Sequence, residues 1–441
     1  MKRLFDSVLS EWASAQNAKP MLLRGARQVG KTYCVRTLGR RFRHFVEINF
    51  EETPEAGRFF EGALTAAPIA AKLSAFAGKP IRPGESLLFL DEVQGQPRVL
   101  ASLRYFREQM PGLHVVAAGS LLEFALEEVP SFGVGRVTSR FLYPMTFPEF
   151  LDAIGEGALA EMVEAADFTH PLDDVFHERL VERYRAYLLV GGLPEAVAAY
   201  AESGNLLDAS GVLDDLLRDF RDDFAKYRRR VPLQRLDETF RSVAVQTGSR
   251  FVCSSVSPDT KSTAILAALF LLEKAGLVHR VVETAASGLP LGAQADERRF
   301  KALIGDTGLC QRLLGLELGR ELLRDGADLV NKGGLAELAA GLALIAGQSP
   351  QTHPQLHYWQ RESRAGNAEV DYVVAVGQRI VPVEVKAGTR GSMQSLRVFL
   401  AEKHLPFGVR LSLENFGSLP DVRILPLYAV HRLHALIERE G

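Results

Sequence analysis

The stretch Gly25-Ala-Arg-Gln-Val-Gly-Lys-Thr32 decides the fold of the N-terminal part of this chain. An apolar run, residues 21–23, precedes it, and a segment with helical character follows. A loop with this spacing can wrap its backbone N–H groups around the α- and β-phosphates of a nucleotide, while Lys31 reaches the β- and γ-phosphates and Thr32 offers its hydroxyl to Mg²⁺. The positive end of the following helix adds to this attraction. The alternative is a glycine-containing turn beside a surface lysine.

The predicted ligands of the nucleotide are the consecutive positions of this loop. They are Gly25, Ala26, Arg27, Gln28, Val29, Gly30, Lys31 and Thr32.

A strand that ends in two carboxylates is the second element of the predicted nucleotide site. Residues 86–90 are a continuous apolar run, as expected for a parallel strand covered on both faces, and Asp91 and Glu92 follow. Open α/β sheets bind ligands at the carboxyl ends of their strands. We therefore predict a Walker B element in which Asp91 holds Mg²⁺ through its water shell and Glu92 polarises the attacking water. A pair of capping carboxylates after a buried strand is the alternative.

A third strand and a basic segment contribute further candidates. Residues 114–118 form a strand that delivers Ser120 to the same edge of the sheet, where it could sense the γ-phosphate or act as a helix N-cap. Arg136 and Arg140 follow, and either could supply a transition-state arginine in cis or to a neighbouring subunit. Of the two, we favour Arg136; a solvated surface arginine is the alternative.

Length and composition limit the class of protein. A chain of 441 residues exceeds the size at which one core stops growing, so two or three domains are expected. With 52 Lys+Arg against 54 Asp+Glu, the net charge of −2 provides no overall attraction to nucleic acid or to a membrane. The start lacks a signal-peptide h-region and no long uncharged apolar stretch occurs, so we expect a soluble cytoplasmic protein. The three cysteines lie far apart, which excludes a disulfide framework.

Near the C-terminus, a predicted β-hairpin places two carboxylates face to face. Residues 371–376 and 379–386 alternate as strands around Gly377-Gln378, and a glycine first in the turn suits type II′. The resulting register sets Asp371 opposite Glu384, with Cα atoms about 4.5 Å apart. Like charges in that arrangement are destabilising, so a divalent cation between them would remove the conflict.

Two further residues extend this predicted metal site. Lys386 points to the same face of its strand as Glu384. Glu337, on a preceding helix, is the best candidate for an additional oxygen ligand of a hard cation, Mg²⁺ or Mn²⁺.

These motifs together resemble the bacterial and archaeal AAA-type ATPases that carry a C-terminal domain of unknown function with a nuclease-like core. In related ATPases a Gly-x-Pro turn of the lid packs near the adenine, so the resemblance nominates Gly192 and Pro194 for base contact. The resemblance to these ATPases spans nearly the whole chain. It rests on residues 25–32, Leu90-Asp-Glu-Val-Gln94, Gly119-Ser120, Gly135-Arg136, residues 142–151, Gly191-Gly-Leu-Pro-Glu195 and Glu384-Val-Lys386.

The order of Glu337, Asp371 and Glu384-x-Lys386 resembles the PD-(D/E)xK nuclease superfamily. The resemblance implies that the acidic residues bind Mg²⁺ and that the lysine orients water or stabilises the phosphorane. Val370 stands where the motif has proline, and Gln394 is a further candidate for contact with the scissile phosphate. A degenerate nuclease fold kept as a docking surface is the alternative.

The expected fold is therefore α/β with three parts. Residues 1–205 form a P-loop AAA-type ATPase domain with its lid, residues 206–315 a helical, winged-helix connector, and residues 316–441 a restriction-endonuclease-like domain. Either ATP and Mg²⁺ gate a nuclease that acts on nucleic acid, or the chain is an ATP-dependent switch whose inactive nuclease fold docks a protein partner. In both cases we expect a homo-oligomer and no membrane contact.

Overall fold

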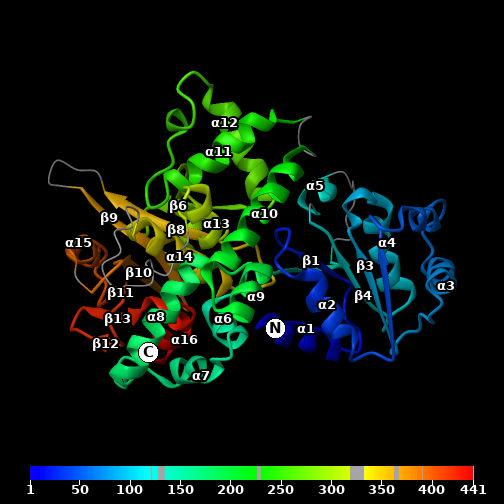
Figure 1. The fold of residues 1–441 in the computed structure, drawn as a ribbon, viewed down its shortest axis with the longest axis horizontal. Coiled ribbons are helices and arrows are strands. Elements are labelled where there is room, and N and C mark those ends of the chain that lie inside the picture. The colour runs from blue at the N-terminus through cyan, green and yellow to red at the C-terminus, as the bar shows by residue number, and fades with distance from the viewer. Residues whose placement is uncertain are drawn as a thin grey trace. The chain divides into compact units, whose positions relative to one another are not determined.

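The computed structural model describes residues 1–120, 122–127, 135–225, 230–317, 332–361, 367–389 and 391–440. The chain divides into two compact units (Figure 1). Unit 1 contains Met1–Tyr143, Lys274–Gly276 and Ser349–His353, and unit 2 contains Pro144–Glu273, Leu277–Gln348 and Pro354–Gly441. The three expected parts differ from this division, because residues 144–205 belong to unit 2.

Unit 1 is built on a sheet whose described strands all run parallel, in the order β2-β3-β4-β1-β5. Strand β3 is buried along its whole length, which is why its sequence is continuously apolar rather than alternating. The strands are β1 (Met21–Arg24), β2 (His44–Asn49), β3 (Ser86–Asp91), β4 (His114–Ala118) and β5 (Thr138–Phe141). The helices are α1 (Phe5–Ser14), α2 (Lys31–Gly39), α3 (Ala66–Ala77), α4 (Pro97–Gln109) and α5 (Leu122–Glu127).

The core of unit 1 lies between this sheet and its helices. Apolar residues of β2, β3 and β4 form one cluster with apolar residues of α3 and α4. Leu90 of β3 and Phe106 of α4 are both fully buried in it. Burying such side chains stabilises the fold by roughly 1.5–3 kcal/mol each. The sheet edge that carries Asp91 is thereby held in one position.

Unit 2 contains a mixed sheet whose described strands follow the order β12-β13-β11-β10-β9-β8-β6-β7. Its strands are β6 (Val278–Thr284), β7 (Ala295–Ile304), β8 (Leu356–Arg361), β9 (Ala368–Val376), β10 (Arg379–Val385), β11 (Gly408–Ser412), β12 (Gly417–Ser418) and β13 (Val422–Pro426). Its helices are α6 (Phe147–Ala153), α7 (Gly157–Ala165), α8 (Asp174–Val190), α9 (Pro194–Ser203), α10 (Leu206–Phe224), α11 (Leu233–Val245), α12 (Ser262–Lys274, whose last residue is assigned to unit 1), α13 (Thr307–Leu313), α14 (Lys332–Ala346), α15 (Gln394–Lys403) and α16 (Leu433–Arg439).

The expected winged helix is met only in part. Helices α11 and α12 and the antiparallel pair β6–β7 occur in the predicted order, but only a 3₁₀ turn, Cys253–Ser255, stands between the two helices. Strand β6 also pairs with β8, so the hairpin belongs to the large sheet of unit 2 rather than to a separate module. That pairing joins segments more than 70 residues apart, and local periodicity carries no signal for it.

The C-terminal hairpin has the predicted register. Val376 pairs with Arg379 and Tyr372 with Val383, which continues to Asp371 opposite Glu384. Gly377 has a φ of 58° and Gln378 is not among the residues with positive φ, as a type II′ turn requires. In the described part of the chain, no helix is both long and apolar enough to cross a bilayer.

Candidate functional site

The predicted phosphate loop of unit 1 connects β1 to α2, and two glycines fix its path. Gly25 has a φ of 145°, and a Cβ atom there would lie 2.2 Å from the carbonyl oxygen of Leu142. Gly30, with a φ of 93°, is the N-cap of α2. A side chain at either position would be strained, so the glycine spacing in the sequence reflects backbone geometry. The loop thus ends on the N-terminal end of α2, which favours anions.

Lys31 begins α2 and folds back over this loop. Its Nζ donates hydrogen bonds to the carbonyl oxygens of Gly25 (2.9 Å) and Ala26 (2.7 Å). Burial lowers the pKa of Lys31 to about 8. The charged ammonium is therefore poorly solvated, and a phosphate group would be a stronger partner than two carbonyls.

Thr32 and Asp91 meet across the sheet edge. The hydroxyl of Thr32 donates to Oδ2 of Asp91 over 2.8 Å, although the two residues are 59 positions apart in the chain. Burial raises the pKa of Asp91 to about 6. A hydroxyl and a carboxylate at this separation are oxygen ligands of the kind that Mg²⁺ and its water shell accept. These two residues fit the cation that the motif implies.

The carboxylate of Glu92 lies beside this pair. Glu92 has a φ of 53°, an uncommon value for a residue other than glycine. Its Oε2 accepts a hydrogen bond from Nε2 of Gln94 at 2.7 Å and a longer one from the hydroxyl of Ser120 at 3.4 Å. Because β4 lies between β1 and β3, Ser120 at its end falls between the phosphate loop and Asp91.

Gln94 belongs to the motif at residues 90–94, but the sequence indicated no separate role for it. The structure shows that its side chain lies over Gly119, where a Cβ atom would be 2.2 Å from Oε1 of Gln94. The signal available in the sequence was the glutamine two residues after Glu92 together with the glycine that ends β4.

Arg136 lies at the opposite edge of the same sheet. Thr138, the first residue of β5, pairs with Met21, the first residue of β1, so the segment before β5 is far from the loop that follows β1. The guanidinium of Arg136 pairs with Glu108, near the end of α4, and its Nε lies 2.8 Å from Oε1 of that residue. In this structure Arg136 therefore lies away from the phosphate loop of its own subunit. A role toward a neighbouring subunit is still a proposal.

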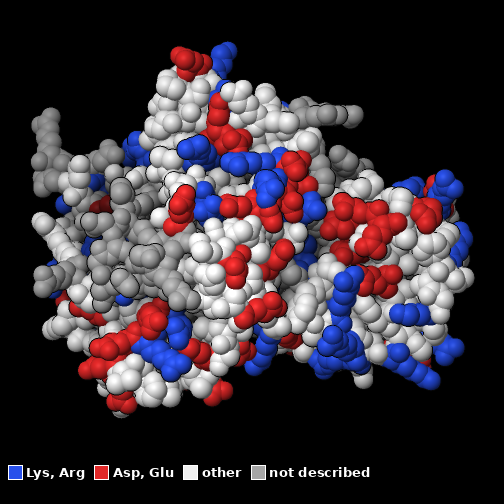
Figure 2. Space-filling view, in the orientation of Figure 1, with Lys and Arg blue, Asp and Glu red and all other residues white. Residues whose placement is uncertain are grey.

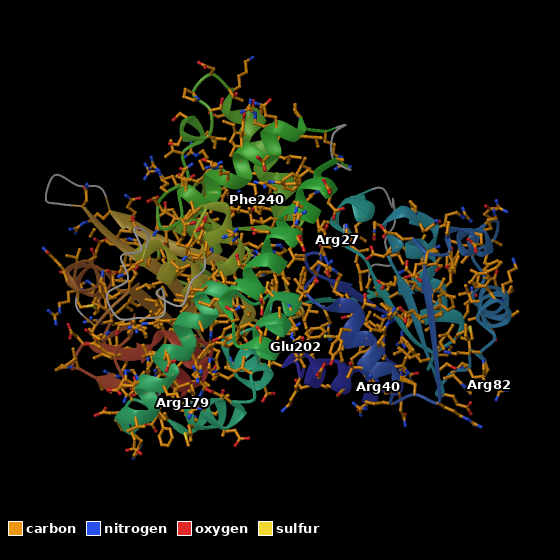
Figure 3. The ribbon with its side chains drawn as sticks, viewed as in Figure 1. Arg27, Arg40, Arg82, Arg179, Glu202 and Phe240 are labelled. Atoms are coloured by element: carbon orange, nitrogen blue, oxygen red, sulfur yellow. The ribbon has the colours of Figure 1, made fainter. Side chains whose placement is uncertain are left out.

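Figure 3 marks the two edges of unit 1. Arg27, in the phosphate loop, lies at one end of α2, and Arg40, directly after α2, lies at the other. Arg82, which precedes β3, lies farther to the right than Arg40 in this view. On the face in Figure 2, basic and acidic side chains are interspersed, without a broad basic area among the described residues.

In unit 2, the turn that holds Gly192 and Pro194 packs against a buried carboxylate. Oδ2 of Asp306 accepts the backbone N–H of Gly192 at 2.6 Å, while its Oδ1 accepts that of Leu309. A Cβ atom on Gly192 would lie 2.1 Å from the carbonyl oxygen of Met145. Pro194 starts α9. This close packing explains why residue 192 is a glycine. The predicted contact of Gly192 and Pro194 with the adenine base stays a prediction.

The second candidate site lies wholly in unit 2. Glu337 on α14, Asp371 on β9 and Glu384 on β10 are all buried or largely buried. Oδ2 of Asp371 accepts the backbone N–H of Val385, and Oε1 of Glu384 accepts a hydrogen bond from Nζ of Lys386 at 2.6 Å.

Two residues that the sequence did not indicate complete this cluster. Nζ of Lys301, on β7, lies 2.7 Å from Oε1 of Glu337 and 3.8 Å from Oδ1 of Asp371. It also forms an ion pair with Glu369 on β9. Lysine is rarely buried fully unless paired, so the apolar end of β7, residues 300–304, with Lys301 as its one charged residue, was the available signal.

The pKa values in this cluster reflect burial among charges. Burial lowers the pKa of Lys301, but the charges of Glu337, Asp371 and Glu369 outweigh it, so the pKa is raised. Burial raises the pKa of Glu337 to about 7, and burial followed by the charge of Asp371 raises that of Glu384 to about 7.

The cluster does not fit the divalent cation that the sequence resemblance implies. Within the described ranges, no group of three or more His, Cys, Asp and Glu side chains is arranged to hold a metal ion. The space that the carboxylates of Glu337, Glu369 and Asp371 share is taken by the ammonium of Lys301.

Gln394 starts α15, and Gly391 lies against the side chain of Lys386.

Comparisons with known families cover three segments. Residues 17–151 match a family described as an AAA domain. Residues 181–319 and residues 332–429 each match a family described as a domain of unknown function. No curated protein matches the chain.

Two solved structures show distant likeness to this chain. A Walker-type ATPase of Pyrococcus abyssi is 18% identical, over 71% of this chain and 95% of that chain, with a TM-score of 0.45. The Orc1 protein of Aeropyrum pernix, solved in complex with DNA, is 14% identical, over 71% of this chain and 93% of that chain, with a TM-score of 0.27. Such scores carry no information on function.

Proposed function

From the AAA-type P-loop domain of residues 17–151, we propose that this protein binds ATP with Mg²⁺ and hydrolyses it to ADP and phosphate. The contact between Thr32 and Asp91, 2.8 Å long, is the observation that supports this most directly. It brings the last residue of the phosphate loop to the end of the acidic strand, and a Mg²⁺·nucleotide needs both groups in one place.

The side chains around this contact have separate proposed roles. The N–H groups of the loop hold the phosphates, and Lys31 leaves the carbonyls of Gly25 and Ala26 to reach the β- and γ-phosphates. Thr32 and Asp91 hold the cation, which supplies charge stabilisation when bound.

The chemical step is proposed for the water next to Glu92. As that water attacks the γ-phosphorus, the bond from the γ-phosphorus to the bridging oxygen breaks, ADP leaves, and Glu92 receives the proton. Ser120, whose hydroxyl is 3.4 Å from Oε2 of Glu92, is placed to report on the γ-phosphate. An arginine from a neighbouring subunit, Arg136 in our proposal, would require a homo-oligomer.

For unit 2 we propose a docking or regulatory module rather than a nuclease. The ion pairs of Lys301 with Glu337 and Asp371 support this choice, because a nuclease of the implied type needs Mg²⁺ or Mn²⁺ among Glu337, Asp371 and Glu384. Its partner would be a protein, or a nucleic acid held without cleavage. The nucleotide state of unit 1 would set whether the partner is held.

Phosphate release measures the ATPase directly. The wild-type protein should release phosphate from ATP with Mg²⁺ and stop in EDTA, while Lys31→Ala should be inactive under both conditions. In parallel, single- and double-stranded DNA and RNA are incubated with the protein, ATP and Mg²⁺ or Mn²⁺. Cleavage that disappears in Asp371→Asn would favour the nuclease over the docking module, and equal phosphate release by Lys31→Ala would contradict the ATPase.

A further inference from the structure

Lys301 is among the largest fully buried side chains of the described chain, with 0% of its surface exposed. Its ammonium contacts carboxylates from two different elements, Glu337 on α14 and the pair Glu369 and Asp371 on β9. The centroid of the Tyr358 ring, on β8, lies 5.2 Å from Nζ. An ammonium in this setting is held by both ion pairs and a cation–π contact.

Lys301 connects elements that are not neighbours in the sheet. Strands β6 and β8 lie between β7 and β9 in the strand order, yet Nζ of Lys301 meets Asp371 of β9. Lysine has a flexible four-carbon stem that ends in a compact positive charge with three donors.

The buried carboxylates of this cluster are compensated by two ammonium groups. Isolated carboxylates are costly to bury, and removing one partner of a buried ion pair leaves an uncompensated charge. Of the four carboxylates at this place, three face Lys301, while Glu384 is paired with Lys386. The second oxygen of Glu384, Oε2, is buried and has no hydrogen-bond partner.

We infer that Lys301 is a built-in cation that occupies the position a divalent metal would otherwise take among Glu337, Glu369 and Asp371. Unit 2 therefore keeps a metal-free acidic cluster, and the loss of one side chain converts it to a metal site. Without the ammonium, Glu337, Glu369 and Asp371 would offer a cation carboxylate oxygens alone, the ligand type that hard cations such as Mn²⁺ prefer. This goes beyond the proposed ATPase and does not depend on it.

The test is a calorimetric titration of nucleotide-free, full-length protein with Mn²⁺. The wild-type protein should bind no Mn²⁺ at this cluster. Any Mn²⁺ that it binds elsewhere should also bind to Asp371→Asn. Lys301→Met, which keeps the length of the stem but not its charge, should bind Mn²⁺ at least tenfold more tightly than the wild type. Adding Asp371→Asn to Lys301→Met should abolish the gained site, which separates it from any cation bound at Thr32 and Asp91.

Lys386→Met is the matched control, because it removes one ammonium near the same cluster but leaves Lys301 in place. It should gain no Mn²⁺ site. Melting curves give an independent reading: Lys301→Met in EDTA should melt on the order of 10 °C below the wild type and recover with Mn²⁺. The wild type should show no rise in melting temperature with Mn²⁺ that Asp371→Asn removes.

Two results would overturn the inference. One is a wild-type melting temperature that rises with Mn²⁺ and loses that rise in Asp371→Asn, a test that needs no folded Lys301 variant. The other is a folded Lys301→Met protein that binds no Mn²⁺ and melts with the wild type in EDTA. Neither result bears on phosphate release, so failure here is distinguishable from failure of the proposed ATPase.

Discussion

Nε2 of Gln94 donates a hydrogen bond to Oε2 of Glu92 over 2.7 Å, while Oε1 of the same amide is buried and has no hydrogen-bond partner. The amide is therefore aimed at the carboxylate rather than satisfied by its surroundings. Gln94, two residues after Glu92 in the chain, thus orients the carboxylate that we propose to activate water.

The first prediction is that Gln94→Ala lowers kcat with little change in nucleotide affinity. A hydrogen bond to a charged group contributes about 1.5–3 kcal/mol, so kcat should fall roughly 10- to 100-fold. Steady-state phosphate release and equilibrium nucleotide binding separate the two quantities. Gly119→Ala, whose Cβ atom would lie 2.2 Å from Oε1 of Gln94, should have a similar effect. A faster Gln94→Ala enzyme would mean instead that Gln94 holds Glu92 away from water.

The second prediction concerns the phosphate loop. Lys31→Ala and Thr32→Ala should each abolish productive binding of Mg²⁺·ATP, because one removes the contact to phosphate and the other a hydroxyl that faces Asp91. Binding of a fluorescent ATP analogue is the measurement, with circular dichroism to show that the fold is kept. Arg40→Ala, at the far end of α2, is a control that should bind like the wild type (Figure 3). Wild-type turnover by Lys31→Ala would show that the site is misassigned.

The third prediction separates the two carboxylates that end β3. Glu92→Gln keeps the shape of the side chain but cannot accept a proton, so it should bind ATP normally and lose turnover at least 100-fold. ATP should remain uncleaved on the protein after rapid removal of free nucleotide. Equal losses of binding and of turnover would make Glu92 a metal ligand or a structural residue.

The fourth prediction is a pH dependence set by Asp91. Burial raises its pKa to about 6, so its carboxylate is charged above that pH and protonated below it. A proton and Mg²⁺ compete for the same oxygen atoms, and the Mg²⁺-dependent part of nucleotide affinity should therefore be lost as the pH falls through 6. Titrations between about pH 5 and 8 would follow it, and Asp91→Asn should lack the step. A pH-independent Mg²⁺ effect in the wild type would count against Asp91 as the group responsible.

Local signals in the sequence were sufficient for the elements that carry these predictions. The glycines of the phosphate loop follow from backbone conformation, the apolar run before Asp91 from burial on both faces, and the hairpin register from a two-residue turn. Each is a property of neighbouring residues, so each can be predicted without knowledge of the rest of the fold. The order of the strands, which brings Thr32 to Asp91, was not predicted from these local signals.

Only the tertiary structure decided which distant groups share a site. Lys301 and Asp371 are 70 positions apart and lie on strands separated by two others, and nothing in local periodicity specifies that pairing. The same holds for Arg136, which the parallel pairing of β5 with β1 places at the edge away from the phosphate loop. Short-range sterics and burial fix local conformation, whereas contacts between distant segments depend on the strand order and packing of the whole unit.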